Sequence, residues 1–254
     1  MSALLEARNV SLAFGGLQVT RDVSFQLNSG DRVALIGPNG AGKTTLVNLI
    51  TGDLAPSAGH LLMGEDDITG FSIPERVQRG LVRTFQTTRL FQNLTVADNV
   101  ALAIMQRRRI SKRFFSSSTE LPEVRAEWCE ILGHLGLDRL AYRKVVELAY
   151  GQQRLIELAI GLALHPKVLL LDEPAAGVPH DEAPKILEAI NALPKDIAVL
   201  MIEHDMDLVF KFASRVLVLA AGKLIFEGSP ADVTADHEVR RAYLGSYADA
   251  RRST

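Results

Sequence analysis

The chain has 254 residues, of which 47% are hydrophobic and 23% charged, and its formal net charge is −2. These values are typical of a globular protein with a sizeable core, and they exclude a chain-wide basic field for binding nucleic acid. The single cysteine, Cys129, excludes an internal disulfide and favours the reducing cytoplasm. The apolar runs fall short of the ~20 residues that a spanning helix needs, so we expect no membrane-spanning segment. The acidic start MSALLEARNV also lacks the layout of a secretion signal.

The first third of the chain combines antiparallel strands with a strand, a glycine loop and a helix. Residues 4–27 alternate around the turn FGG, which predicts two paired strands. The apolar run RVALIG (32–37) stops at a glycine, and the sequence after the glycine-rich loop resumes with helical periodicity. Further strands are predicted near 59–63 and 80–86, on either side of a polar stretch.

Helical patterns cover residues 87–165. Thr95 and Asp98 have the spacing of a capping box at the start of one helix. The segment 106–123 interrupts the pattern, and its serine cluster and proline predict a mobile loop.

Two apolar runs and a hairpin pattern follow. VLLLDE (168–173) and IAVLMIEH (197–204) are separated by a helical stretch, as is typical of parallel strands in an α/β sheet. RVLVLAAGKLIFEG (215–228) predicts a hairpin, and a charged helical tail follows it. The last third of the chain therefore predicts an α/β sheet followed by a helical tail.

The segment GPNGAGKT (37–44) matches the P-loop pattern G-x-x-x-x-G-K-[ST] in full, between a predicted strand and a predicted helix. Glycines let backbone N–H groups approach a triphosphate, and the helix adds its positive N-terminal end. We expect Lys43 to reach the β- and γ-phosphates and the Thr44 hydroxyl to bind Mg²⁺. The predicted nucleotide contacts of this part of the chain are Gly37, Asn39, Gly40, Gly42, Lys43, Thr44 and Thr45.

Two carboxylates follow the run VLLL and supply the remaining chemistry. Asp172 stands at the C-terminal end of a predicted strand, where α/β sheets bind ligands, and is predicted to hold the metal. Glu173 follows it, and a carboxylate there can orient or deprotonate the attacking water. A solvated turn would be the better interpretation of this pair alone, and the P-loop reverses that preference.

Five motifs occur in the order found in one protein family: the P-loop, RTFQ (83–86), LAYGQQR (148–154), VLLLDEP (168–174) and MIEHD (201–205). Through them the full chain resembles the nucleotide-binding subunit of an ATP-binding cassette transporter. The resemblance implies an α/β fold, with a P-loop NTPase parallel-sheet core, an antiparallel β subdomain and an inserted helical subdomain. It implies one nucleotide-binding domain over 1–254, with the helical subdomain near 87–165 and a helical tail near 229–254. The implied activity is ATP hydrolysis with Mg²⁺.

The resemblance also implies roles for residues outside the P-loop. Gln86 matches the glutamine that senses Mg²⁺ and water, and His204 matches the histidine that contacts the γ-phosphate. Phe14 matches the aromatic residue that stacks on adenine, although a phenylalanine is commonly buried in the core. Gly151 and Gln152 match the signature that closes on the ATP of a second subunit. Gly151 stands at the start of the helical run 151–165, where an anion is favoured.

LAYGQQR, DEPAAG (172–177) and RAYLG (241–245) make the closer match the importer subgroup for branched-chain amino acids. That match implies transmembrane permease subunits, a second ATP-binding subunit arranged head to tail and, indirectly, a periplasmic or extracellular solute-binding protein. It implies a peripheral location on the cytoplasmic face of the cell membrane. These letters carry no substrate chemistry, so the same role for another small solute stays open.

The chain departs from the family at three positions. Ala149 and Tyr150 stand where the signature usually has serine and glycine, and Pro179 stands where an aspartate couples the two ATP sites. We therefore assign no coupling role to a side chain at 179. Tyr150 has no physical explanation from the sequence.

Two other function classes compete with the transporter. The basic run QRRRISKRFF (106–115) is the best support for a soluble cassette acting on nucleic acid or ribosomes. A solvated insertion is the simpler interpretation of this run, contact with anionic lipid is another, and we expect no nucleic-acid partner. A GTPase switch is disfavoured because the N-K-x-D motif that reads guanine is absent.

Overall fold

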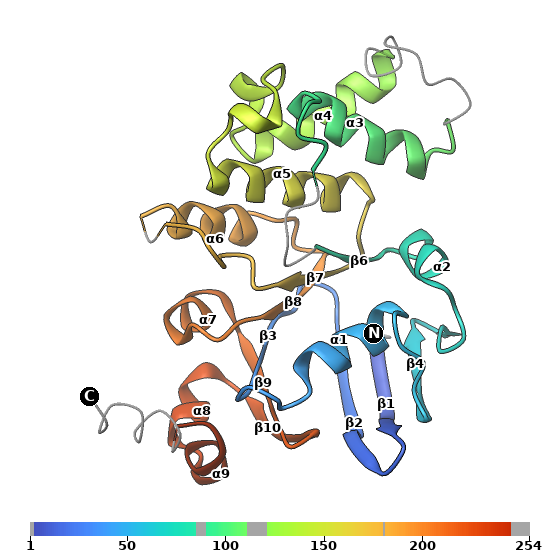
Figure 1. Ribbon diagram of the computed structural model, residues 1–254, viewed down its shortest axis with the longest axis vertical. Coiled ribbons are helices and arrows are strands. Elements are labelled where there is room, and N and C mark those ends of the chain that lie inside the picture. Colours follow the sequence, from blue (N-terminus) through green and yellow to red (C-terminus); the bar gives the residue numbers. More distant parts are fainter. Residues whose placement is uncertain (1–2, 85–89, 111–120, 180, 245–254) are drawn as a thin grey trace. The chain divides into compact units, whose positions relative to one another are not determined.

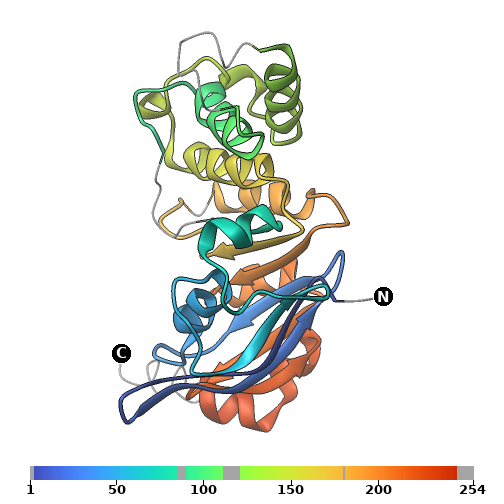
Figure 2. The ribbon, with the colours of Figure 1, turned by 90° about the vertical axis from the view of Figure 1, so that its right-hand side faces the viewer.

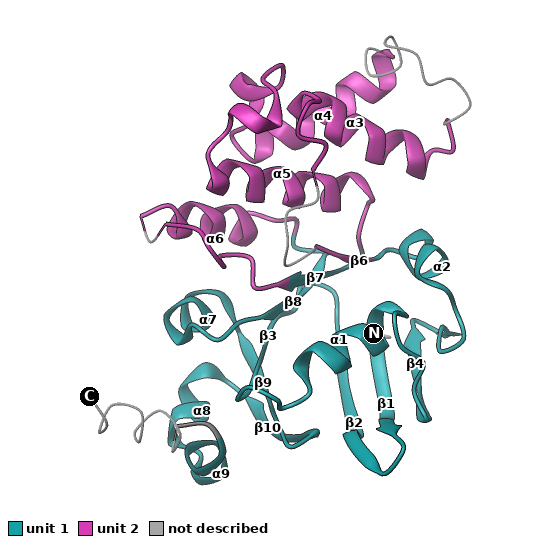
Figure 3. Cartoon of the chain, in the orientation of Figure 1, with its two compact units in different colours: residues 1–81, 167–171, 195–254 teal, residues 82–166, 172–194 magenta. Residues whose placement is uncertain are grey.

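The computed structural model describes residues 3–84, 90–110, 121–179 and 181–244 (Figure 1). The chain forms two compact units, coloured separately in Figure 3. The first unit comprises 1–81, 167–171 and 195–254, and the second comprises 82–166 and 172–194. Among the described residues, no helix combines the length and the apolar character that crossing a membrane requires.

An antiparallel sheet begins the first unit. Its strands are β1 (Leu5–Phe14), β2 (Leu17–Leu27), β4 (Ala58–Met63) and β5 (Asp66–Asp67), in the order β2-β1-β4-β5. The pairing of β1 with β2 through the turn at Gly15 confirms the predicted hairpin. One face of the sheet is apolar because alternate side chains along each strand point to the same side.

The second sheet has the strand order β10-β9-β3-β8-β7-β6. Its strands are β3 (Arg32–Ile36), β6 (Leu81–Arg83), β7 (Val168–Asp172), β8 (Ala198–Ile202), β9 (Arg215–Ala220) and β10 (Lys223–Gly228). Strand β3 pairs in parallel with β8 and β9, and β9 forms the predicted antiparallel hairpin with β10. Strands β7 and β8 are buried at every residue, as their continuous apolar runs predict. This sheet confirms the predicted α/β class.

The helices of the first unit are α1 (Lys43–Thr51), α2 (Ile73–Gln78), α7 (Met206–Phe212), α8 (Pro230–Ala235) and α9 (His237–Val239), followed by a helical turn at Arg240–Leu244. Apolar side chains of α1 pack with both sheets in one core cluster that includes Leu35, Leu46 and Leu61. Figure 2 shows the antiparallel strands in blue and cyan and the C-terminal hairpin and helices in orange and red. Helix α2 lies in the stretch that the sequence pattern described only as polar.

The second unit is helical. It contains α3 (Val96–Arg107), α4 (Pro122–His134), α5 (Tyr150–Ala163) and α6 (Ala183–Asn191), with short 3₁₀ turns at Asp138–Leu140 and Val145–Glu147. Helix α3 packs against α4 and α5, and α5 packs against α6.

Two sequence predictions fall in this helical unit. The predicted capping box is present, because the Thr95 hydroxyl accepts from the Asp98 N–H at 3.1 Å and Asp98 accepts from the Thr95 N–H at 3.1 Å. Of the predicted loop 106–123, residues 111–120 lie outside the described part. The unit also holds 172–194, beyond the predicted helical span 87–165, and the single domain over 1–254 stays a prediction.

Candidate functional site

The P-loop joins β3 to α1 in the first unit, as its strand and helix context predicts. The Lys43 ammonium donates to the carbonyl oxygens of Gly37 at 2.6 Å and Pro38 at 3.1 Å, so it lies against the backbone of its own loop. Asn39 and Thr44 are exposed, and Thr45 is partly exposed. The loop therefore presents a cation, backbone N–H groups and hydroxyl oxygens on one accessible segment.

Two P-loop glycines are required by packing within the protein. A Cβ on Gly37 would overlap the carbonyl oxygen of Leu219, and a Cβ on Gly42 would lie 2.9 Å from the carbonyl oxygen of Val19. Gly42 also has a φ of +101°, in the left-handed region that favours glycine. The loop is tied down further, since Gly222 N–H donates to the Ala41 carbonyl at 3.0 Å. The phosphate loop is thus held against β2 and the β9–β10 hairpin before any nucleotide binds.

The starts of α1 and α5 differ from those of the other described α-helices. Helices α3, α7, α8 and α9 begin with a side-chain cap, and α2, α4 and α6 carry a proline in the first two positions. Helix α1 follows Gly42 and α5 follows Ala149, and neither has a side-chain cap or an early proline. Their first N–H groups are therefore left for another acceptor, which suits an anion.

Phe14 and His204 also lie in the first unit, and both are accessible. Phe14 ends β1 and is 56% exposed, which excludes a core role for its ring. His204 follows β8, and its side chain is 60% exposed. Its turn is held by the buried carboxylate of Glu203, which accepts from the backbone N–H of His204 at 3.1 Å. Both predicted side chains are thus accessible, and their roles stay predictions.

The predicted carboxylates lie in the second unit. Asp172 ends β7, is 7% exposed, and pairs with the Arg83 guanidinium at 2.5 Å. Glu173 comes next with a φ of +49°, an unusual backbone conformation for a residue with a Cβ. Gln86 lies outside the described residues, so its role stays a prediction.

The signature stretch forms the first turn of α5, which begins at Tyr150, one residue before the predicted start. Ala149 has no side-chain acceptor, and the Gln152 side-chain oxygen accepts from the Ala149 N–H at 3.1 Å. Gly151 is buried, and a Cβ there would overlap the Glu182 carboxylate. Gln152 therefore accepts from the residue before α5 and not from an N–H of its first turn, while Gly151 leaves room for an acidic side chain of the loop before α6.

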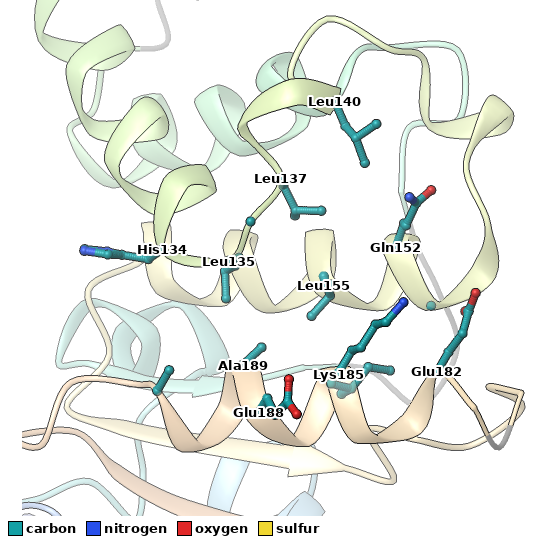
Figure 4. A pocket seen from close by; sticks show the side chains of 14 residues that line it. His134, Leu135, Leu137, Leu140, Gln152, Leu155, Glu182, Lys185, Glu188 and Ala189 are labelled. Atoms are coloured by element: carbon teal, nitrogen blue, oxygen red, sulfur yellow. The ribbon is translucent and has the colours of Figure 1, made fainter.

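A pocket of about 460 Å³ lies within the second unit, beside this turn. Figure 4 shows Glu182 and Lys185 rising from the start of α6 toward the first turn of α5, beside Gln152. Leucine side chains from the end of α4, the following turn and α5 also line it, namely Leu135, Leu137, Leu140 and Leu155. The lining is therefore mixed: it is polar at the end next to the signature, and His134 and Glu188 add polar groups elsewhere.

Three residues at the predicted sites were missed by sequence reasoning. Arg83 stands inside the motif RTFQ, Glu203 stands inside MIEHD, and Glu182 follows the position of Pro179. An arginine near a predicted metal carboxylate is the signal that could have identified Arg83. The contact of Glu182 with Gly151 has no local signal, because the two residues are far apart in the sequence.

Comparison with known proteins adds relatives over the full length. The profile of the family described as "ABC transporter" matches residues 20–176, and that of "Branched-chain amino acid ATP-binding cassette transporter" matches residues 223–249. The chain is 37% identical over 251 residues to the high-affinity branched-chain amino acid transport ATP-binding protein LivG of Salmonella typhimurium, covering 95% of this chain and 98% of LivG. It is 34% identical over 244 residues to the lipopolysaccharide export system ATP-binding protein LptB of Escherichia coli, covering 96% and 98%.

A solved structure agrees with these relatives. The crystal structure of the ADP conformation of an ATP-binding cassette of an ABC transporter superposes with a TM-score of 0.84 at 33% identity. The superposition covers 96% of this chain and 100% of that one. From the five motifs, the P-loop geometry, the matching profile and these full-length relatives, we conclude that the chain belongs to the ABC transporter family and is one of its ATP-binding cassettes.

Proposed function

We propose that this ATPase powers the import of branched-chain amino acids through a membrane permease. The ATPase part is carried by one observation: a complete P-loop, fixed by packing, that leads into a helix start without a side-chain cap. The cargo is supported by the C-terminal profile match at 223–249 and by the likeness to LivG. We assign recognition of the amino acid to the permease and a solute-binding protein, because the letters that mark the subgroup carry no substrate chemistry.

The residues present fit a bound Mg²⁺. This ion prefers oxygen ligands and is usually held by one or two protein groups together with substrate phosphates. Thr44 offers an exposed hydroxyl and Asp172 a carboxylate that already has a cationic partner in Arg83. When bound, the ion would neutralise charge on the phosphate oxygens. We propose Thr44, Asp172 and Gln86 as the side chains that hold it, directly or through water.

The remaining roles follow from position and chemistry. Glu173 acts as the base that orients or deprotonates the attacking water, and His204 contacts the γ-phosphate. Phe14 offers its exposed ring to adenine. Gly151 and the uncapped start of α5 receive the γ-phosphate of ATP bound to a second ATP-binding subunit. The dimer closes on ATP and reopens after hydrolysis, at the cytoplasmic face of the membrane.

The cargo is the part of the proposal with a real competitor. LptB, which serves lipopolysaccharide export in Escherichia coli, is 34% identical to this chain, close to the 37% of LivG. Overall identity therefore separates the cargoes poorly, and the C-terminal profile is the feature that favours amino acids.

Action on nucleic acid is a less well supported alternative than transport of another solute. In the basic run 106–115, Arg107 and Arg108 both pair with the Glu127 carboxylate at 2.7 Å, and residues 111–120 lie outside the described part. Two of the cations that suggested polyanion binding thus share one carboxylate within the unit, which offsets part of their charge. Salt-dependent binding to RNA or DNA near physiological ionic strength would revive this alternative.

Two measurements test the proposal. Purified protein should hydrolyse ATP with Mg²⁺, and ATP should compete better than GTP for the site; a preference for GTP would contradict the assignment. The membrane and solute-binding proteins that co-purify with the chain should then be identified. The solute-binding protein should be titrated with leucine, isoleucine, valine and unrelated solutes. Binding of an unrelated solute alone would leave the ATPase intact and remove the amino-acid cargo.

A further inference from the structure

Tyr150 stands where the family signature usually has glycine, and its ring has a defined partner. It is the first residue of α5 and is 38% exposed. The ring lies against Gly177, at which a Cβ would be 3.4 Å from the ring carbon Cε1 and 3.5 Å from the hydroxyl oxygen. Gly177 has a φ of +75°, so glycine suits both the turn and the close approach of the ring. The aromatic ring and this glycine are therefore complementary.

Arg154 lies one helical turn after Tyr150 and connects the same two segments. Its side chain is 4% exposed, and the guanidinium carbon lies 5.2 Å from the centroid of the Tyr150 ring. Its Nη1 donates to the Glu157 carboxylate at 2.9 Å, and its Nη2 donates to the Ala176 carbonyl oxygen at 3.2 Å. A buried guanidinium held by a ring, a carboxylate and a carbonyl has a fixed position.

The carbonyl that Arg154 holds belongs to a turn that begins at Glu173. The Ala176 N–H donates to the Glu173 carbonyl at 3.0 Å, and the Val178 N–H donates to the Ala175 carbonyl at 3.1 Å. Glu173 itself has a φ of +49°, a conformation that persists only when neighbouring contacts hold it. Loop 173–178 is therefore a pair of overlapping turns fastened to α5 through Ala176 and Gly177.

We propose that Tyr150 and Arg154 are positioning residues for ATP hydrolysis. They lock loop 173–178 to the first turn of α5, so that the Glu173 carboxylate and the signature glycine Gly151 keep one fixed arrangement. This inference rests on the proposed ATPase function and adds a role for two side chains that touch no reacting atom. It also explains the tyrosine of the signature, because a glycine at 150 would leave the loop without its ring contact.

Steady-state kinetics is the first test. Tyr150→Ala should lower kcat about tenfold, since small misplacements of a catalytic group are costly, while KM for ATP stays within twofold because the P-loop is unchanged. Tyr150→Phe keeps the ring and should retain at least about half of the wild-type kcat. The kcat of Arg154→Lys should lie between those of Tyr150→Ala and Tyr150→Phe, because a lysine lacks the planar fork of the guanidinium. The matched control is Tyr142→Ala, which removes an exposed tyrosine of the same unit that contacts Trp128 and should leave kcat unchanged.

Hydrogen exchange in nucleotide-free protein is the second test, and it does not depend on activity. The amides of Ala176 and Val178 should exchange several-fold faster in Tyr150→Ala and Arg154→Lys than in wild type or Tyr142→Ala. Unchanged exchange at both amides, wild-type kcat in Tyr150→Ala, or an equal loss in Tyr150→Phe would each overturn the lock. A wild-type protein without ATP hydrolysis would instead overturn the proposed function, and the exchange result would still decide whether the two residues hold the loop.

Discussion

The starts of α1 and α5 are alike in their capping but differ in the charged side chains around them. Both lack a side-chain cap, so both leave backbone N–H groups for a ligand. At α1 the following side chain is the cation Lys43, and the loop before it is fixed by packing. At α5 the neighbouring group is the Glu182 carboxylate, which faces Gly151. We therefore propose that α1 binds the triphosphate by itself, whereas α5 contributes only when a partner subunit brings an ATP already bound.

The largest expected effect concerns Glu173, the proposed catalytic base. Glu173→Gln should keep ATP binding and lower turnover by at least about 10²-fold, since general base catalysis typically contributes 10²–10⁴-fold. The variant should also accumulate as an ATP-bound dimer, measured by size-exclusion chromatography with light scattering. Glu188→Gln, an exposed carboxylate of α6, is the control. Turnover within a few-fold of wild type would remove Glu173 from this role.

The second prediction tests α5 without touching α1. Gly151→Asp should lower ATPase activity about 100-fold, because it sets a carboxylate against both Glu182 and the incoming phosphate. The dissociation constant of ATP for the isolated subunit, measured by calorimetry, should stay within about twofold because the P-loop is intact. The matched control is Gly133→Asp, since the position of its Cβ is open. If Gly151→Asp weakened ATP binding to the isolated subunit, but Gly133→Asp did not, this would contradict the separate roles proposed for the two helix starts.

The third prediction changes α1 and leaves α5 as it is. Lys43→Ala should weaken ATP binding by roughly 10–100-fold, because a hydrogen bond to a charged group contributes about 1.5–3 kcal/mol. Dissociation constants from calorimetry provide the measurement, and Lys223→Ala removes an exposed lysine of the same unit as a control. Unchanged affinity would exclude Lys43 from the phosphate site.

Sequence reasoning predicted features made by neighbouring residues better than contacts between distant segments. The P-loop, the capping box at Thr95 and the hairpin 215–228 depend on neighbours in the chain, so their spacing identifies them. The contact of Glu182 with Gly151 and the pair of Arg83 with Asp172, 89 residues apart, depend on the folded chain. No pattern of adjacent letters records such contacts.

Arg76 shows the same limit in the first unit. It lies in a stretch that was expected only to be polar, yet it is 1% exposed. Its guanidinium donates to the carbonyl oxygens of Leu49 at 2.8 Å and Ile50 at 2.6 Å, at the end of α1. Burial lowers the pKa of Arg76 from its ordinary value. The letters alone could not reveal this burial, because the acceptors lie 26 and 27 residues earlier in the chain.

The smallest expected effect concerns the missing cap of α5. Ala149→Ser restores the family's usual letter and supplies a side-chain acceptor at the cap position, which should stabilise the unit by about 0.5–2 kcal/mol. For a chain of this size that corresponds to a rise in Tm of about 1–8 °C, measured by calorimetry.

ATPase activity of Ala149→Ser should nevertheless stay within about twofold. The serine hydroxyl can donate to phosphate, but it also accepts from a helix N–H that phosphate could otherwise use, so the two effects oppose each other. Ala149→Gly separates the causes, since glycine also favours the cap position but adds no hydroxyl. A gain well above twofold in serine but not in glycine would mean that the hydroxyl itself contacts ATP and that alanine limits the natural signature. An equal gain in both variants would instead show that formation of the first turn of α5 limits ATPase activity. The uncapped start would then be a weakness of this helix rather than a site kept open for the partner's phosphate.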